Sequence, residues 1–95
     1  MTTVPLCEQL PGWELIRPGL AAIAAGRVSM EACLVWIAAP RLRAAGLLSE
    51  VAVPIVEPER KLYALLREKG GDAYPAYQSL LRRLTRFERA LSLVT

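Results

Sequence analysis

The sequence SMEACLVWIAA, residues 29–39, decides the fold of this chain. After Glu31 the stretch has no charged residue and no strongly polar side chain. A helix built from it would be apolar on every side, and a helix of that kind belongs in the interior of a protein. The stretch therefore predicts a short, buried central helix, at about residues 29–39, which the rest of the chain must cover.

Residues on either side of this stretch set its limits. Ser29 suits the N-cap position of a helix, because its hydroxyl can accept a hydrogen bond from a free backbone N–H of the first turn. Gly26 suits the end of the preceding element. Pro40 ends or sharply bends the central helix, since the residue before a proline is driven out of the helical region. Residues 40–46, PRLRAAG, then predict a second short helix that starts at the proline and ends at Gly46.

An amphipathic helix is expected before the central one. It opens at Pro11 or Gly12, and its apolar residues recur at spacings of three and four. These residues are Trp13, Ile16, Leu20 and Ile23. Pro18 and Gly19 interrupt the pattern, because an interior proline removes a hydrogen bond and clashes with the previous turn. We therefore expect a kink there, or two short helices that meet.

Two more helices are expected in the C-terminal half. Pro58 opens the first, and Gly70 followed by Gly71 stops it. The last, a long amphipathic helix at about residues 74–93, has the clearest periodicity of the chain. The residues of this apolar seam are Tyr77, Leu80, Leu84, Phe87, Leu91 and Val94. Residues 47–57 predict an extended loop, because Pro54 lies within the β-branched run and a central strand cannot contain it.

Together these elements predict a single all-α domain over residues 1–95. It is a compact bundle of four to five helices, with an irregular N-terminal segment at residues 1–10. The hydrophobic fraction of the sequence is 54%, above the usual range of about 45–50%. Because a chain of this size has only a modest core, the excess indicates either a dense helical interior or apolar surface used for association.

The amino-acid composition argues against catalysis and against metal binding. The chain has no histidine and only two cysteines, Cys7 and Cys33. Histidine is the usual general base and the commonest metal ligand, and two cysteines cannot supply the four ligands of a zinc site. We expect no enzyme activity, no metal, no cofactor and no small-molecule substrate. Cys33 predicts a buried thiol, and a disulfide between the two cysteines stays open.

The sequence also predicts where the protein resides. Arginines break up the apolar stretches, so none of them is long enough to cross a membrane. The N-terminus has neither the basic flank nor the apolar core of a signal peptide. We therefore expect a cytoplasmic protein.

The net positive charge of the chain is confined to its last helix. Residues 1–73 carry as many acidic as basic residues, so the net charge of +3 comes from residues 74–95. We define the basic face of this helix as Arg82, Arg86 and Arg89, extended by Gln78 and flanked by Arg83. The three arginines lie at i, i+4 and i+7, opposite the apolar seam. Three interpretations stay open: a solvated surface, a helix that contacts nucleic-acid phosphates, or a docking site for an acidic partner.

Two functional hypotheses follow. The first is a protein–protein interaction or structural module without catalysis, which binds another protein or a second copy of itself. Trp13 is its candidate anchor, because tryptophan is enriched at interface hot spots. Other apolar residues left over from the core could join it: Leu20, Ile55, Val56 or the apolar seam. The alternative is a nucleic-acid-binding regulator that uses the basic face, within a helix–turn–helix arrangement over residues 62–84.

Overall fold

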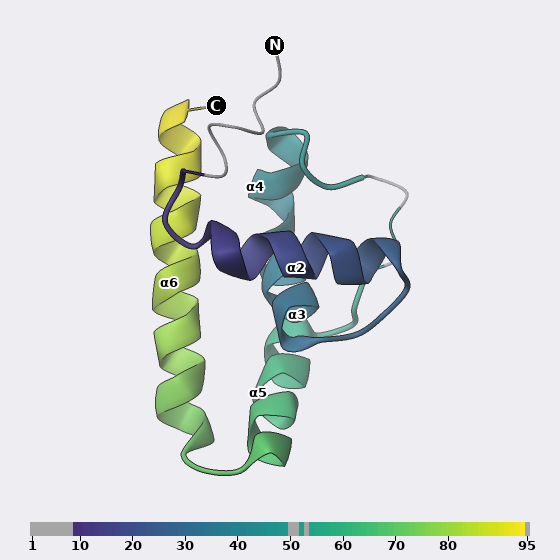
Figure 1. The fold of residues 1–95 in the computed structure, drawn as a ribbon, viewed down its shortest axis with the longest axis vertical. Coiled ribbons are helices and arrows are strands. Elements are labelled where there is room, and N and C mark those ends of the chain that lie inside the picture. Colours follow the sequence, from purple (N-terminus) through teal and green to yellow (C-terminus); the bar gives the residue numbers. More distant parts are fainter. Residues whose placement is uncertain (1–8, 50–51, 53, 95) are drawn as a thin grey trace.

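The protein is described here by a computed structural model, which places residues 9–49, 52 and 54–94. These residues form helices and no strand, which confirms the predicted all-α class. In chain order the helices are α2 (Trp13–Ala24), α3 (Met30–Ile37), α4 (Ala39–Ala44), α5 (Pro58–Lys69) and α6 (Ala73–Val94). Figure 1 shows α4, α3 and α5 stacked in a column, with α6 running beside it and α2 lying across it.

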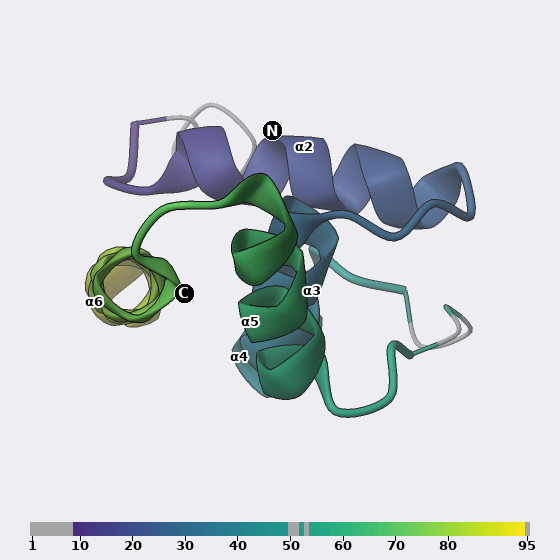
Figure 2. The ribbon, with the colours of Figure 1, turned by 90° about the horizontal axis from the view of Figure 1, so that it is seen from below.

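The central helix predicted from the sequence is α3. Its residues from Ala32 to Trp36 are all buried, and the side chains of Cys33 and Val35 have no exposed surface. Both α2 and α5 pack against α3, and Figure 2 shows α2 lying across one side of the column that α3 and α5 form. The part of α3 that follows Glu31, which is entirely apolar, is therefore covered by amphipathic neighbours from the same chain.

Local hydrogen bonds set the limits of α3. Ser29 caps it as predicted, because its Oγ accepts a hydrogen bond of 3.1 Å from the backbone N–H of Ala32. The helix is shorter than the expected range of about 29–39. The chain turns at Ala38, and α4 begins at Ala39 with Pro40 in its first turn. The proline therefore starts a new helix directly after the turn, where its missing N–H has no consequence.

α2 is one helix with Pro18 inside it, so of our two expectations the one of two short helices that meet there was wrong, and the expected kink stays a prediction. Pro18 is exposed, so water can replace the hydrogen bond that the proline cannot donate. Gly19 is buried against α3. A Cβ atom at Gly19 would overlap the carbonyl oxygen of Glu31 and lie 2.6 Å from Cγ2 of Val35. The interruption of the apolar pattern thus marks the place where α2 crosses α3 at close range.

α2 and α4 end in the same kind of turn. After α2, Gly26 has a φ of 72°, and the N–H of Arg27 donates to the carbonyl of Ala22 at 2.8 Å. After α4, Gly46 has a φ of 77°, and the N–H of the next residue donates back into the helix at 2.9 Å. Both are Schellman caps, in which glycine adopts a left-handed conformation that other residues avoid. The predicted glycine stops are confirmed.

α5 and α6 form an antiparallel helical hairpin (Figure 1). Leu84, Phe87 and Leu91 of the apolar seam are buried in the core. Tyr63 of α5 meets Tyr77 of α6 edge to face, with the ring centroids 5.6 Å apart. Most of the apolar seam is therefore used within the chain.

Two expected irregular segments are only partly described. Of residues 1–10, the first eight, including Cys7, lie outside the described residues, and residues 9–10 are not helical. Of residues 47–57, those that the structure describes belong to no helix or strand. Residues 50, 51, 53 and 95 also lie outside the described part.

Replacing Gly19 with alanine tests the crossing of α2 and α3. The new Cβ would overlap the α3 backbone, so the two helices would have to separate. We expect the free energy of unfolding to fall by about 3 kcal/mol, at the upper end of ordinary overpacking costs. Urea denaturation followed by circular dichroism measures this change.

Gly26→Ala is the matched control for this substitution. A Cβ at Gly26 would have no neighbour within 4 Å, so only left-handed backbone strain of about 1 kcal/mol is expected. Equal losses of stability at the two positions would contradict the close helix crossing.

Candidate functional site

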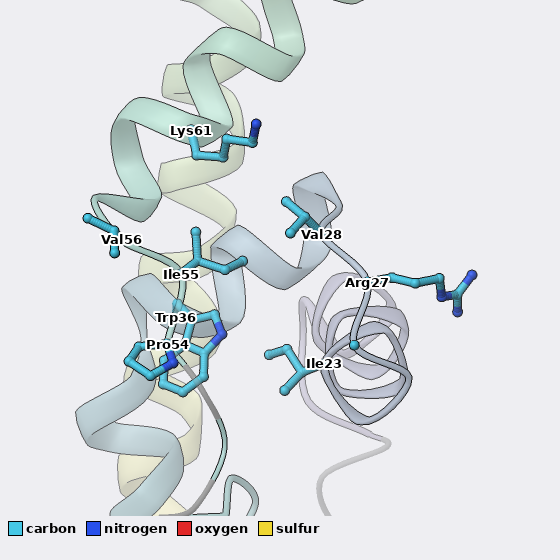
Figure 3. Close-up of a pocket in the computed structure, with 9 residues that line it drawn as sticks. Ile23, Arg27, Val28, Trp36, Pro54, Ile55, Val56 and Lys61 are labelled. Carbon is cyan, nitrogen blue, oxygen red and sulfur yellow. The ribbon is translucent and has the colours of Figure 1, made fainter.

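A groove opens beside Trp36, between the end of α2 and the loop that leads into α5. Its first depression has a cavity volume of about 420 Å³, within the range of about 300–1,000 Å³ typical of binding pockets. The apolar lining of this depression comes from four separate parts of the chain (Figure 3): Ile23, Val28, Trp36, Pro54, Ile55 and Val56.

A second depression adjoins the first, with Ile23 as their common wall. Its cavity volume is about 320 Å³. The described residues that line it are Leu20, Ile23, Ala24, Leu47, Leu48, Ser49 and Ala52. We call the two depressions together the α2 groove. Two adjacent apolar depressions can receive two neighbouring side chains of one partner segment, as in helix-in-groove recognition.

Local structure positions the walls of the α2 groove. Leu20 and Ile23 lie three apart on α2 and therefore share a helix face. The Schellman cap at Gly26 leads the chain to Val28, and the equivalent cap after α4 leads it into the wall of the second depression. Two of the walls therefore begin at helix ends that the sequence specifies.

The residues that line the first depression include the ring of Trp36 and a charged side chain. Trp36 is 7% exposed, and its indole Nε1 is buried with no hydrogen-bond partner among the described residues. Figure 3 shows this nitrogen on the edge of the ring that is turned toward Ile23. Lys61 also lines the depression, whereas the side chain of Arg27 points away from it (Figure 3). None of the described lining residues of the groove is acidic.

The basic face lies on the exposed side of α6. Arg82, Arg86 and Arg89 are all exposed, and none of them forms an ion pair with another described residue. Glu88, the acidic residue of this helix, is half-buried. Burial raises the pKa of its carboxyl group, and the positive charge of Arg41 in α4 acts in the opposite direction. The structure thus brings together the three arginines that the spacing predicted.

The other two polar residues assigned to this face have partners within the chain. Gln78 donates a hydrogen bond from Nε2 to the hydroxyl of Tyr74 at 2.8 Å. Arg83 donates to Oε2 of Glu14 at 2.7 Å and so links α6 to α2. Hydrogen bonds from the backbone N–H of Glu14 and from Arg83 lower the pKa of the Glu14 carboxyl. Both side chains of this pair are largely exposed, so it contributes little to stability.

Trp13 is half-buried at the start of α2. Its ring packs against Phe87 of α6, with the centroids 6.3 Å apart and the planes inclined by 31°. Its Nε1 is buried without a hydrogen-bond partner among the described residues. Gly12 permits this contact, because a Cβ there would lie 2.9 Å from Cβ of Phe87. Much of the Trp13 ring therefore packs within the protein, and its role as an interface anchor stays a prediction.

The described residues contain no cluster of three side chains that could hold a metal ion. Cys33 is a free, fully buried thiol. Burial raises its pKa, opposed by the positive charge of Lys61, so the reactive thiolate is disfavoured. No helix in the described part of the chain is long and apolar enough to cross a membrane.

Sequence reasoning identified some groove residues but did not bring them together. Leu20, Ile55 and Val56 were expected to be left over from the core, and the structure places all three along the α2 groove. Val28 and Lys61 were missed. Val28 did carry a signal, since it is an apolar residue in the short linker between a helix stop and a helix cap, where no helical periodicity would bury it.

Comparison with known proteins assigns no family to this chain. No protein-family model matches it, and neither the curated proteins nor the solved structures include a match. The α2 groove and the basic face are therefore the features from which a function can be inferred.

Proposed function

We propose that the protein is a cytoplasmic protein–protein interaction module that acts without catalysis and associates with a second copy of itself. The observation that carries this proposal is the open, apolar α2 groove with exposed valines at its mouth. Val28 is 55% exposed and Val56 is 81% exposed. Apolar surface that is concave, contiguous and open to solvent is typical of a site that another surface covers.

The hydrophobic excess of the sequence supports the same proposal. Part of the excess fills the core, where small residues such as Ala32 and Ala38 have no exposed surface. Another part lines the α2 groove. Burying apolar surface contributes about 25 cal/mol per Å², so covering the groove favours association even without a specific polar contact.

Replacing Val28 with glutamate tests the proposal, because the change places a carboxylate at the groove mouth without touching the core. We expect the wild-type protein to move from its monomer mass of 10.4 kDa toward twice that mass as its concentration rises through the micromolar range. Val28→Glu should weaken this association by about tenfold or more, since a carboxylate is costly to bury in an apolar contact. Sedimentation equilibrium measures both effects.

Leu93→Glu is the matched control, because Leu93 is 86% exposed near the end of α6 and does not line the groove. This variant should associate like the wild type. A wild-type protein that stays monomeric throughout, or equal weakening by the two substitutions, would contradict the proposal.

The basic face favours a second candidate function, that of a nucleic-acid-binding regulator. The supporting observation is that Arg82, Arg86 and Arg89 are exposed on one face and free of ion pairs with the other described residues. In a DNA-reading helix–turn–helix the two helices meet at about 90–120°. α5 and α6 instead run side by side (Figure 1), so only the positive charge of the basic face supports this candidate.

Fluorescence anisotropy with a labelled DNA duplex tests this candidate. Binding should weaken steeply with salt, with a slope of about −0.9 in the logarithmic plot for each phosphate contact. Reversing the charges of Arg82, Arg86 and Arg89 should abolish binding, whereas reversing the exposed residues Arg17, Arg60 and Arg67 should weaken it only slightly. Absence of binding at low salt, or equal effects of the two triple variants, rules this candidate out.

A further inference from the structure

We propose that the basic face and the tyrosines beside it bind a single-stranded nucleic acid, whose bases stack on the tyrosines while its phosphates follow the arginines. This inference rests on the second candidate function above and names the form of nucleic acid that the surface takes. It is carried by one juxtaposition: a depression lined by tyrosines opens beside the N-terminal turns of α6, where the basic face begins.

Every tyrosine of the chain lines this depression. The sequence holds three tyrosines, Tyr63, Tyr74 and Tyr77. They come together between α5 and α6 around a cavity volume of about 350 Å³, which we call the tyrosine hollow. The rings of Tyr63 and Tyr77 stand at 87° to each other and form a corner, and Tyr74 is 58% exposed. Accessible aromatic rings of this kind are the platforms on which the bases of a single strand stack.

The charges around the tyrosine hollow suit a neutral base better than a phosphate. The other residues that line the hollow are Glu59 and Arg60, whose charges are opposite. Nε of Arg60 also lies 3.4 Å from a carboxylate oxygen of Glu57, so this arginine is already paired. A base is uncharged and stacks on tyrosine through its flat face, whatever its identity. The hollow therefore offers a place for a base, and the phosphates need a separate site.

A row of side chains on α6 connects the tyrosine hollow with the arginines. Four exposed side chains follow one another at intervals of four residues and are therefore neighbours on the helix surface: Tyr74, Gln78, Arg82 and Arg86. The hydrogen bond of 2.8 Å from Gln78 to the hydroxyl of Tyr74 holds the ring beside the basic face. A depression of about 260 Å³, lined by Gln78, Leu81 and Arg82, continues along the row.

The arginines of the basic face supply the site for phosphates. Arg82, Arg86 and Arg89 are exposed and form no ion pair with another described residue. Glu88, the acidic residue of α6, is half-buried and interacts with the positive charge of Arg41. From the tyrosine hollow to the last of these arginines the helix rises roughly 22 Å, at about 1.5 Å per residue. This length suits several consecutive nucleotides of a strand.

The tyrosine hollow distinguishes a single strand from a duplex. In a duplex the bases are stacked on one another, so their flat faces cannot reach a protein side chain unless the base leaves the stack. The bases of a single strand can turn toward aromatic rings. α6 also lies beside α5 along its length (Figure 1) and does not project alone as a helix that enters the major groove. A single strand is therefore the form that can occupy the hollow and the basic face together.

Fluorescence anisotropy with labelled strands tests this inference. A thymidine strand of about twelve nucleotides should bind more tightly than an abasic strand of equal length, because only the first can stack in the hollow. Tyr74→Ala should weaken binding of the thymidine strand by about tenfold and leave binding of the abasic strand unchanged. The slope against salt in the logarithmic plot should be about −2, as for three phosphate contacts on a single strand. A uridine strand measured alongside separates RNA from DNA as the source of the bases.

Two variants control for the role of the Tyr74 ring. Tyr74→Phe keeps the aromatic face and loses only the hydroxyl, so it should retain most of the affinity for the thymidine strand. Val56→Ala shortens another exposed apolar side chain, which is 81% exposed and lies outside α6, and it should bind like the wild type. Circular dichroism confirms that each variant retains its helices.

The outcomes separate this inference from the candidate function on which it rests. Preference for the thymidine strand over the abasic strand, lost in Tyr74→Ala, supports stacking in the hollow. Equal binding of the two strands, or tighter binding of a duplex, would overturn the inference and leave the electrostatic candidate in place. A polyglutamate chain that binds as tightly as the thymidine strand would also overturn it, because the basic face would then suit an acidic protein. Absence of binding to strand and duplex at low salt would overturn both.

Discussion

The close approach of Gly19 to the backbone of α3 is the contact on which the rest of the structure depends. It allows α2 to lie directly on α3, whose apolar side chains after Glu31 are unfavourable in contact with water. Leu20 and Ile23 follow on the same helix, so the depth at which α2 rests on α3 also sets one wall of the groove. The packing of α2 on α3 and the position of the candidate interface therefore both depend on the absence of a side chain at Gly19.

Features that depend on local chemistry could be predicted from the sequence. The buried helix, its cap at Ser29 and the glycine stops each follow from neighbouring residues, and the structure confirms them. The role of Gly19 could not be predicted, because the pattern Pro18–Gly19 is the same whether a helix breaks or crosses another at short range. Only the position of α3 decides between these two outcomes.

The α2 groove could not be predicted for a similar reason. Its lining residues come from α2, α3, two linkers and the start of α5, and no periodicity connects them. The basic face, by contrast, lies on one helix, so its spacing was sufficient to place Arg82, Arg86 and Arg89 together. Arg83 was assigned to the edge of that face, but its bond to Glu14 depends on how α2 packs on α6, which spacing within one helix does not reveal.

Native-state hydrogen exchange of the α3 amides tests most directly whether this helix is buried by its own chain. The amides of Val35 and Trp36 should exchange only through global unfolding, with the free energy and denaturant dependence of the whole protein. Their protection should not depend on protein concentration. Exchange through a local opening far below the global free energy, or protection that appears only as concentration rises, would contradict the account, because α3 would then need a partner to cover it.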